Sequence, residues 1–545
     1  MIEVKNSIRF KKRHPTIRIQ SVKQLGVMAG CILEFLYSHR VFIFLTAFIL
    51  AVFQSFWQFL NLRANFPPGP FHLPFIGNAL NFDQAYPHRT FLKFKKIFGP
   101  VFTIHLPNPV VVIADFDLLK KVNSLHGNAL SGRPSGYVYG IFTVHKPDGD
   151  GITLCQGERW SAQRRFALRT LRDFGMGKSI LENKINDHLG RLLKRMDSYL
   201  EVENGICKAK IDLSLHISFC VGGIINDLVM GRHHYFGDPE FVYFKKLIDN
   251  TLKGFASPSL QLVDAFPLTR FFVPYYRQYV REGFAIQTYF IKEIQKHVDT
   301  YDVETEPTNF IDAYLKDMHE SNHKHMSLQS LAIDSGDLWT GGMETTVTAL
   351  RWAILYLIHY PEVQAKLHKE IDNYLDVTPA QVSERHLLPY VQATIDELLR
   401  ITNVLPWGIP HQALEDIEVE GHVIRAGTTV MFQVGTVHFD ESNFPEPNVF
   451  KPERFLDEFG NYVPHKKLIP FGIGKRQCLG ESLARMEVFL IFVALVQNFS
   501  FHAIDEKLPS IERRPGMTCV PHSYVCEIRK RHKNLIMADN NQFEK

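Results

Sequence analysis

The sequence predicts a mainly helical α+β fold: one large helical body with small sheets at its periphery. Of the 545 residues, 45% are hydrophobic and 22% are charged. This ordinary globular composition excludes disorder, collagen and a pure coiled coil as the main architecture. Helix-period stretches dominate the chain, strand-like runs are few and short, and no repeat of about 20–50 residues indicates a solenoid.

Apolar residues recur at helical spacing in long stretches of the chain. These stretches are 155–175, 179–205, 238–255, 276–300, 326–360, 362–376, 384–402 and 478–498. Strand signals are short and occur at 100–105, 109–114, 416–420 and 428–434. Glu420-Gly421 predicts a turn between the last two strands. Helices alongside separate short strands favour an α+β body, which we expect over residues 78–526, followed by a polar tail over 527–545.

The chain begins with a basic extension at 1–40, followed by an apolar stretch at 41–60 and a Pro-rich linker at 61–77. Residues 41–60 hold no charge, and twenty helical residues extend about 30 Å, enough for one membrane span. A signal peptide is the alternative, but it would have a shorter apolar region and a small-residue cleavage site, whereas Trp57 and Gln58 follow here. The sequence therefore predicts one N-terminal transmembrane anchor and a stiff spacer.

Charge is unevenly distributed along the chain. Residues 1–23 carry seven basic side chains and one acidic one, a charge of +6, so the total of +4 leaves −2 for residues 24–545. A near-neutral body excludes nucleic acid as the partner, because that affinity needs many Lys and Arg contacts. The positive-inside rule would keep the extension in the cytosol and send the body across the membrane. A mitochondrial presequence, or translation from Met28, would each remove that conflict.

The positions of the cysteines indicate one candidate metal ligand. The seven cysteines form no CxxC pair, so a reducing compartment is favoured. Cys478 follows glycines 472 and 474 and precedes Gly480 and an apolar helical run. Glycines let the backbone approach something flat, and a helix N-terminus stabilises a thiolate that can bind a metal, a haem iron being one case. A buried free cysteine in a turn is the alternative.

With the spacing Phe-x-x-Gly-x-x-x-Cys-x-Gly, this segment resembles the cysteine loop of the cytochrome P450 family of haem-thiolate monooxygenases. Residues 67–525 are similar to the microsomal drug- and steroid-metabolising group of animals. The resemblance implies the cytochrome P450 fold and haem b with Cys478 as axial thiolate. It also implies O₂ as co-substrate, and contacts to the cofactor from Phe471, Gly474 and Gly480.

A second segment, Trp339–Thr346 in a long helical stretch, resembles the distal helix of the same family. Gly341 and Gly342 weaken a helix interior, which favours room made for a ligand. The resemblance implies that this room holds O₂ and that Glu344 and Thr345 supply protons to it. A Glu-Thr pair in an ordinary core helix is the alternative.

Donors for the two haem propionates follow from the resemblance. They are Trp160, Arg164, Arg133, His411 and Arg476, each of which, taken alone, would be read as a solvated polar group. Glu397 and Arg400 stand at i, i+3 on one helix face, and Arg454 lies in a segment that resembles the family's third partner. The resemblance implies a buried triad that fixes the scaffold, which is costly unless fully paired.

No flavin fingerprint is present, so electrons come from outside and a separate NADPH-dependent reductase is implied. Arg165, Arg169 and Arg172 recur on one face of the Trp160 helix, and Lys475 lies near Cys478 in sequence. This stripe could receive an acidic donor, although a solvated helix face is the alternative.

The sequence thus predicts a monooxygenase that inserts one oxygen atom into a lipophilic substrate. A non-oxidising haem-thiolate isomerase or dehydratase is an alternative against which Thr345 argues, and a haem-binding sensor is another. The resemblance implies substrate-recognition loops at 131–156, 233–272, 404–410 and 517–520, which are largely apolar and aromatic, so sterols or steroids, fatty acids and xenobiotics fit them equally. We expect a single-pass protein of the endoplasmic reticulum membrane with a cytosolic catalytic domain, a mitochondrial membrane being the alternative.

Overall fold

The computed structural model describes residues 66–531, except 74, 144, 147, 176–178, 322–323 and 376–377. It also describes 38–42, 45–46, 48–50 and 53, while most of the predicted extension and anchor lies outside the described residues. The chain divides into two units, Met1–Asn65 and Phe66–Lys545, and the second contains every predicted site residue. Among the residues that the structure describes, no helix combines the length and apolar character that a membrane crossing requires.

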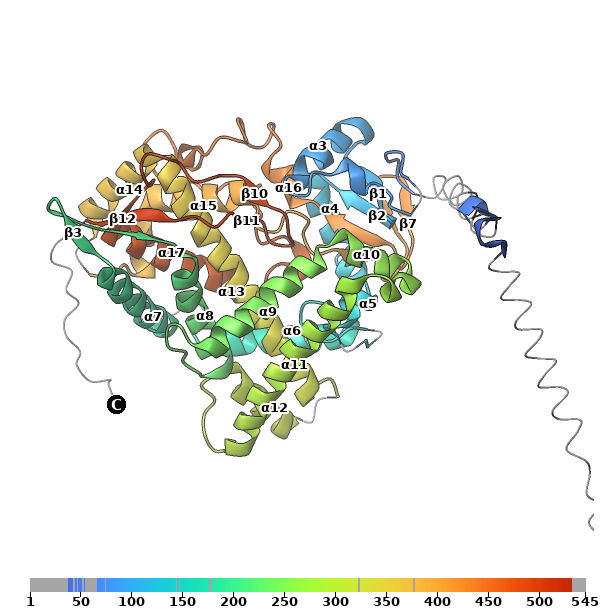
Figure 1. The fold of residues 1–545 in the computed structure, drawn as a ribbon, viewed down its shortest axis with the longest axis horizontal. Helices are drawn as coiled ribbons and strands as arrows, with labels where there is room; N and C mark the ends of the chain where they lie inside the picture. Colours follow the sequence, from blue (N-terminus) through green and yellow to red (C-terminus); the bar gives the residue numbers. More distant parts are fainter. Residues whose placement is uncertain are drawn as a thin grey trace, which may run out of the picture. The chain divides into compact units, whose positions relative to one another are not determined.

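Helices make up most of the second unit (Figure 1). They are α3 (Pro87–Phe98), α4 (Phe116–His126), α5 (Tyr137–Gly140), α6 (Gly157–Asp173), α7 (Ser179–Ser198), α8 (Ser214–Met230), α9 (Pro239–Phe255), α10 (Pro258–Ala265), α11 (Pro274–Thr300), α12 (Phe310–Ser321), α13 (Leu328–His359), α14 (Pro361–Tyr374), α15 (Pro389–Thr402), α16 (Val434–His438) and α17 (Glu481–Asn498). Short 3-10 helices include η2 (Ala129–Ser131), η3 (Pro267–Phe271), η5 (Pro452–Phe455) and η6 (Gly474–Arg476).

Two four-stranded sheets, in the orders β1-β2-β8-β5 and β3-β4-β12-β9, lie toward opposite sides of the unit in Figure 1. The first contains β1 (Val101–Leu106), β2 (Asn108–Ile113), β5 (His411–Gln412) and β8 (Thr429–Phe432). The second contains β3 (Glu201–Glu203), β4 (Ile206–Ile211), β9 (Phe499–His502) and β12 (Cys526–Lys530). β2 and β8 pair in parallel, Val110 opposite Thr429, and the other pairs in these sheets are antiparallel. The predicted mainly helical fold with small sheets is confirmed.

Two sequence predictions differ from the structure at turns. The helix predicted over 179–205 ends at Ser198, and β3 and β4 follow as a hairpin. Its turn residues Asn204 and Gly205 both have positive φ, 52° and 78°, which Asn-Gly adopts readily. The turn at Glu420-Gly421 joins β6 (Ile417–Val419) to β7 (His422–Ile424), not to β8. The sequence did not predict β7, because three residues are too few to show the alternation of apolar and polar side chains that indicates a strand.

Helix α8 has no polar face, which explains why helical periodicity did not reveal it. Every residue from His216 to Met230 is buried, because α8 packs between α7 and α13. The central α13 also contacts α11, α15 and α17. Its two tryptophans are fully buried and both are satisfied: Trp339 Nε1 donates to Asn226 Oδ1 at 2.7 Å, and Trp352 Nε1 donates to the Cys519 carbonyl at 2.7 Å. These contacts fix α13, the helix that carries Glu344 and Thr345.

Candidate active site

The cysteine loop lies between η6 and α17. The Cys478 N–H donates to the Phe471 carbonyl at 2.9 Å, which closes the loop. Gly474 has φ 81°, and a Cβ there would lie 2.0 Å from Asn123 Oδ1, so only glycine fits. Helix α17 begins at Glu481 with Gly480 as its N-cap, so Cys478 lies ahead of the helix instead of in its first turn.

The Cys478 sulfur is accessible to solvent and close to surrounding protein atoms. Its side chain is exposed to solvent, yet enough protein surrounds it that desolvation raises the pKa of the thiol. The backbone hydrogen bond from Gly480 and the charge of Arg164 oppose that shift by favouring the thiolate, while Glu481 adds to it. The N–H and the guanidinium would help to hold a thiolate at this accessible sulfur.

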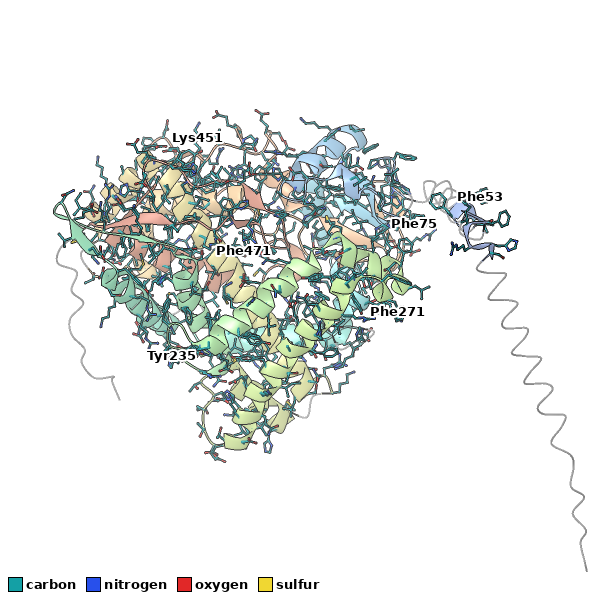
Figure 2. All side chains as sticks on the ribbon, viewed as in Figure 1. Phe53, Phe75, Tyr235, Phe271, Lys451 and Phe471 are labelled. Carbon is teal, nitrogen blue, oxygen red and sulfur yellow. The ribbon has the colours of Figure 1, made fainter. Side chains whose placement is uncertain are left out.

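Phe471 anchors the other end of this loop (Figure 2). Its ring packs against the main hydrophobic core, and the Arg485 guanidinium carbon lies 4.9 Å from the ring centroid. Arg485 in turn bonds Glu481 at 2.9 Å and Asp396 of α15 at 3.1 Å. The loop is therefore tied to α15 and α17, and the two helices hold its backbone in place.

Three arginines from separate parts of the chain gather beside this loop. Arg164 of α6 donates to the Gln477 carbonyl at 2.6 Å, and Arg476 of η6 donates through Nε to the Ser131 carbonyl at 2.8 Å. Arg133, just after η2, donates to the Pro410 carbonyl at 2.8 Å. The Arg476 guanidinium carbon also lies 4.0 Å from the Trp160 ring centroid.

This cluster carries uncompensated positive charge. Burial first, and the neighbouring arginines second, lower the pKa of Arg476, and burial also lowers that of Arg133. Within the described part of the chain, no carboxylate forms an ion pair with Arg133, Arg164 or Arg476. Since buried charges need partners, the cluster is suited to an anionic ligand.

Two further predicted residues adjoin the cluster. Trp160 Nε1 is buried and, among the described residues, has no hydrogen-bond partner. His411 bonds the Leu130 carbonyl through Nδ1 at 2.7 Å, and burial holds its pKa well below the ordinary value, so its ring is neutral. An unpaired N–H and uncompensated guanidinium groups beside a cysteine loop fit a flat cofactor that carries two carboxylates. The residues present therefore fit haem.

The two glycines of α13 have different surroundings. A Cβ on Gly341 would meet no atom within 4 Å, so this residue borders open space. A Cβ on Gly342 would lie 2.6 Å from Ile225 Cδ1, so this glycine serves the close approach of α8. Thr345, one turn after Gly341, donates from Oγ1 to the Gly341 carbonyl at 2.6 Å. Its hydroxyl thus lies at the edge of that space.

Glu344 contacts α9. Its Oε1 lies 3.4 Å from Lys245 Nζ, which also bonds Asp249 at 2.9 Å. Desolvation, with the negative charge of Asp249 second, raises the pKa of Glu344 to about 7 against the opposing charge of Lys245. Sequence reasoning missed Lys245 and Asp249, because an i, i+4 ion pair occurs on many solvated helices and gives no sign of a distant partner.

The predicted triad is assembled in the structure. Arg400 binds Glu397 with two bonds, Nε to Oε2 at 2.7 Å and a terminal nitrogen to Oε1 at 2.8 Å. Arg454 Nε lies 3.0 Å from Glu397 Oε2. Glu397 and Arg400 are fully buried, and the Lys451 N–H also donates to Glu397 at 2.9 Å. The carboxylate is thus fully paired between α15 and η5.

The basic stripe on α6 is solvent-exposed at all three positions. Arg169 forms an ion pair with Asp317 of α12 at 2.9 Å, so one of the three charges is engaged. Lys475 is exposed on the cysteine loop.

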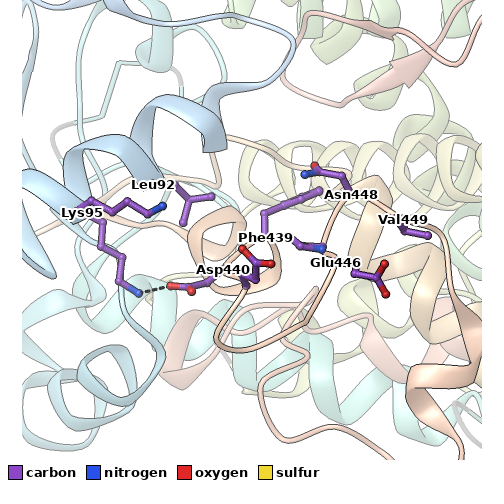
Figure 3. A pocket seen from close by; sticks show the side chains of 10 residues that line it. Leu92, Lys95, Phe439, Asp440, Glu446, Asn448 and Val449 are labelled. Carbon is purple, nitrogen blue, oxygen red and sulfur yellow. Dashed lines mark hydrogen bonds and ion pairs between the residues drawn. The ribbon is translucent and has the colours of Figure 1, made fainter.

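A surface hollow of about 670 Å³ lies between α3 and the segment 439–449 (Figure 3). Lys95 crosses it to Asp440 at 2.8 Å. None of the predicted site residues lines it, so its chemistry is separate from that of Cys478.

Comparison with known proteins identifies the family of the chain. The sequence profile of the family described as cytochrome P450 matches residues 67–528. The chain is 32% identical to a 3-ketosteroid oxygenase of Caenorhabditis elegans over 499 residues, 90% of this chain and 85% of that protein. It is 34% identical to cytochrome P450 2A12 of Mus musculus over 482 residues, 87% of this chain and 95% of that protein. It is 33% identical to cytochrome P450 2C28 of Mesocricetus auratus, covering 86% and 95% respectively.

Members of this family hold haem through a cysteine thiolate, use O₂ as co-substrate and take electrons that originate in NADPH from a reductase. The profile spans nearly the whole second unit, and the relatives match along most of their own length. The chain therefore belongs to the cytochrome P450 family and is a haem-thiolate monooxygenase of lipophilic substrates.

Proposed function

We propose that Cys478 is the thiolate ligand of the haem and that Phe471, Gly474 and Gly480 shape the proximal pocket. One observation carries the proposal: the solvent-exposed Cys478 sulfur, with the Gly480 backbone hydrogen bond, lies beside a partly buried cluster of guanidinium groups that are held by backbone carbonyls and, among the described residues, have no carboxylate partner. Among the other described cysteines, Cys155, Cys220, Cys519 and Cys526 are buried, and Cys207 lies on β4.

Arg133, Arg164 and Arg476, with Trp160 Nε1, would bind the two propionates. The backbone carbonyls that already hold the three guanidinium groups orient them, so little side-chain entropy would be lost on binding. The neutral His411 ring gives its one N–H to the Leu130 carbonyl, so it would line the pocket without adding charge. Ion pairing with two carboxylates would remove the mutual repulsion of the arginines.

Proton delivery is the proposed task of Glu344 and Thr345. The haem, when bound, supplies O₂ activation. On the protein side, the Thr345 hydroxyl can turn its hydrogen from the Gly341 carbonyl toward the open space beside it. Glu344, whose raised pKa keeps a fraction protonated at neutral pH, can bring protons from the α9 side, where Lys245 and Asp249 hold it.

For the substrate we propose a steroid with a 3-keto group as the first class to test. The support is the 32% identity to a protein named 3-ketosteroid oxygenase, which covers 90% of this chain. A spectral titration with 3-ketosteroids, fatty acids and apolar xenobiotics would compare the classes. A spectral response to steroids at lower concentrations than to the others is the expected result, and a preference for fatty acids would contradict it.

The predicted anchor at 41–60 is proposed to hold the protein in the endoplasmic reticulum membrane, with the second unit in the cytosol beside its reductase. Exposed apolar side chains support a second membrane contact. Phe271 and Phe272 are 59% and 83% exposed, Leu268 is 73% exposed, and Phe75 lies 5.7 Å from Phe266, ring to ring (Figure 2). Lipid would remove this apolar surface from water.

Replacing Cys478 with Ser tests the ligand assignment. A hydroxyl is a poor ligand for ferric haem at neutral pH, so the variant should lose the long-wavelength Soret band of the reduced, CO-bound form. Cys207→Ser, on β4, is the matched control and should keep the band. Retention of the band in the Cys478 variant would contradict the proposal.

A further inference from the structure

A second group of metal-ligating side chains lies where α7, α8 and the loop before α9 meet. His188 of α7 places Nε2 at 2.7 Å from Asp227 Oδ2 of α8. His233, three residues after the end of α8 at Met230, places Nδ1 at 2.9 Å from Asp227 Oδ1. The three ligand atoms lie within 4.8 Å of one another.

Within the described part of the chain, one oxygen of the Asp227 carboxylate lacks a hydrogen-bond donor. The Asp227 side chain is 10% exposed, and Oδ1 has no hydrogen-bond partner among the described residues. The His233 nitrogen is close enough to bond it, but the contact lacks hydrogen-bond geometry. A nearly buried carboxylate oxygen without a donor is costly, and a cation between the two atoms would satisfy both.

The residue types narrow the choice of cation. Two imidazole nitrogens and one carboxylate oxygen suit Zn²⁺ and similar first-row ions, whereas Mg²⁺ and Ca²⁺ prefer oxygen ligands alone. Zn–N and Zn–O bonds of about 2.0–2.2 Å place tetrahedral ligand atoms roughly 3.3 Å apart. The two histidine–carboxylate separations, 2.7 and 2.9 Å, are shorter than that value, so an ion would replace these direct contacts, and the side chain of His233, 61% exposed, has room to adjust.

We propose that His188, Asp227 and His233 form a binding site for one divalent transition-metal ion of the zinc class, with water as a fourth ligand. The side-chain exposure of His233 gives the ion a path from solvent. His188 and Asp227 are held by the packing of α7 on α8, so two of the three ligands are preorganised.

The ion would clamp a segment that leads toward the distal helix. Arg232, next to His233, bonds Glu240 of α9 at 2.7 Å and Glu293 of α11 at 3.0 Å. Helix α9 carries Lys245, the partner of Glu344. Binding would therefore join α7 and α8 to the start of α9 and raise the unfolding temperature of the folded protein, since the unfolded chain lacks the assembled site.

The test uses the haem-loaded full chain, without an affinity tag and stripped with a chelator. Zn²⁺ is titrated in competition with a chromophoric chelator. One equivalent is expected to bind, and His233→Ala should weaken it at least about 100-fold, because loss of an outer-shell partner alone costs about 10–100-fold. Asp227→Asn, which keeps the side-chain shape, should weaken it similarly. His319→Ala removes an exposed imidazole of α12 and is the matched control.

Failure of the parent to bind Zn²⁺, or equal binding by the His233 and His319 variants, would overturn the proposal. A Zn²⁺-dependent rise in unfolding temperature is expected in the parent and the His319 variant, and its survival in the His233 variant would also contradict the site. The reduced CO spectrum should be normal in all variants, because Cys478 is unchanged, so the result is independent of the haem assignment.

Discussion

Glu344 and Thr345 are neighbours in α13, yet each depends on a different contact. Thr345 borders open space through Gly341, whereas Glu344 is buried against Lys245 of α9. The sequence alone identified the pair through a resemblance. It could not show that the acid contacts another helix, because Lys245 lies about a hundred residues earlier in the chain.

Thr345→Ala tests whether the Thr345 hydroxyl takes part in proton delivery. Without the hydroxyl, protons reach the oxygen site less effectively, so NADPH consumption should continue while peroxide rises and hydroxylated product falls. The measurement is the ratio of product to NADPH consumed. Thr345→Ser, which keeps the hydroxyl, should restore much of the coupling. A normal ratio in the Ala variant would show that protons arrive by another route.

Lys245→Met tests the proposed role of Glu344 in proton delivery by removing the cation that contacts it. Lys245 lowers the pKa of Glu344, so removing the cation should raise that pKa further above about 7. If the protonated acid is the active form, the high-pH fall in coupled turnover should move to higher pH. Lys246→Met, which removes an exposed neighbouring amine, is the control. A shift to lower pH, or none, would contradict the proposed role of Glu344.

Among the elements, η5 and α15 are joined by one fully paired carboxylate. Arg454→Ala should destabilise the fold by about 1–3 kcal/mol, because it removes one cation from a buried carboxylate that keeps its two bonds to Arg400. The expected results are a lower unfolding midpoint and a small haem-loaded fraction. Arg425→Ala breaks an exposed pair with Asp416 and should cost no more than about 1 kcal/mol. Equal haem loading in the two variants would deny the triad a structural role.

The exposed face of α6 can be tested as an electron-entry surface. Changing Arg165, Arg169 and Arg172 to Gln should raise the reductase concentration needed for half-maximal turnover and flatten its salt dependence. Exposed charges act over only about 8 Å at physiological ionic strength, so substrate spectra should not move. Turnover driven by peroxide needs no reductase and should survive.

The control for net charge is a Gln substitution at Lys253, Arg277 and Arg281, exposed residues of α9 and α11. It removes the same charge from other helices and should leave reductase dependence as in the parent. If both triple variants respond alike, the stripe is a solvated face.

For the molecule as a whole, sequence patterns predicted what is local. The cysteine loop is contiguous, and helices such as α11 and α13 show their period within a single stretch. Helix α8 was not predicted, because it is buried on all sides and therefore lacks the polar face that makes helical periodicity visible in a sequence. The sequence did not predict the group formed by His188, Asp227 and His233, because three separated residues form no motif until α7 and α8 pack together.

The division of the chain at Asn65 leads to a prediction for the whole protein. A chain that begins at Phe66 should incorporate haem normally, because the site residues all lie in the second unit. It should also keep weaker binding to lipid vesicles if Phe271 and Phe272 contact the membrane. Replacing both with Ser in the shortened chain should abolish that residual binding, as measured by flotation. Undiminished binding after the replacement would place the contact elsewhere.

The parallel pairing of β2 with β8 affects how the protein is made. Val110 leaves the ribosome some three hundred residues before its partner Thr429. At about 5–20 residues per second, the hairpin of β1 and β2 waits roughly 15–60 s with one edge unpaired and apolar residues such as Val111 and Ile113 exposed. Such an edge is a template for pairing with another chain. Synthesis of this protein therefore includes a long interval in which a nascent chain is open to aggregation.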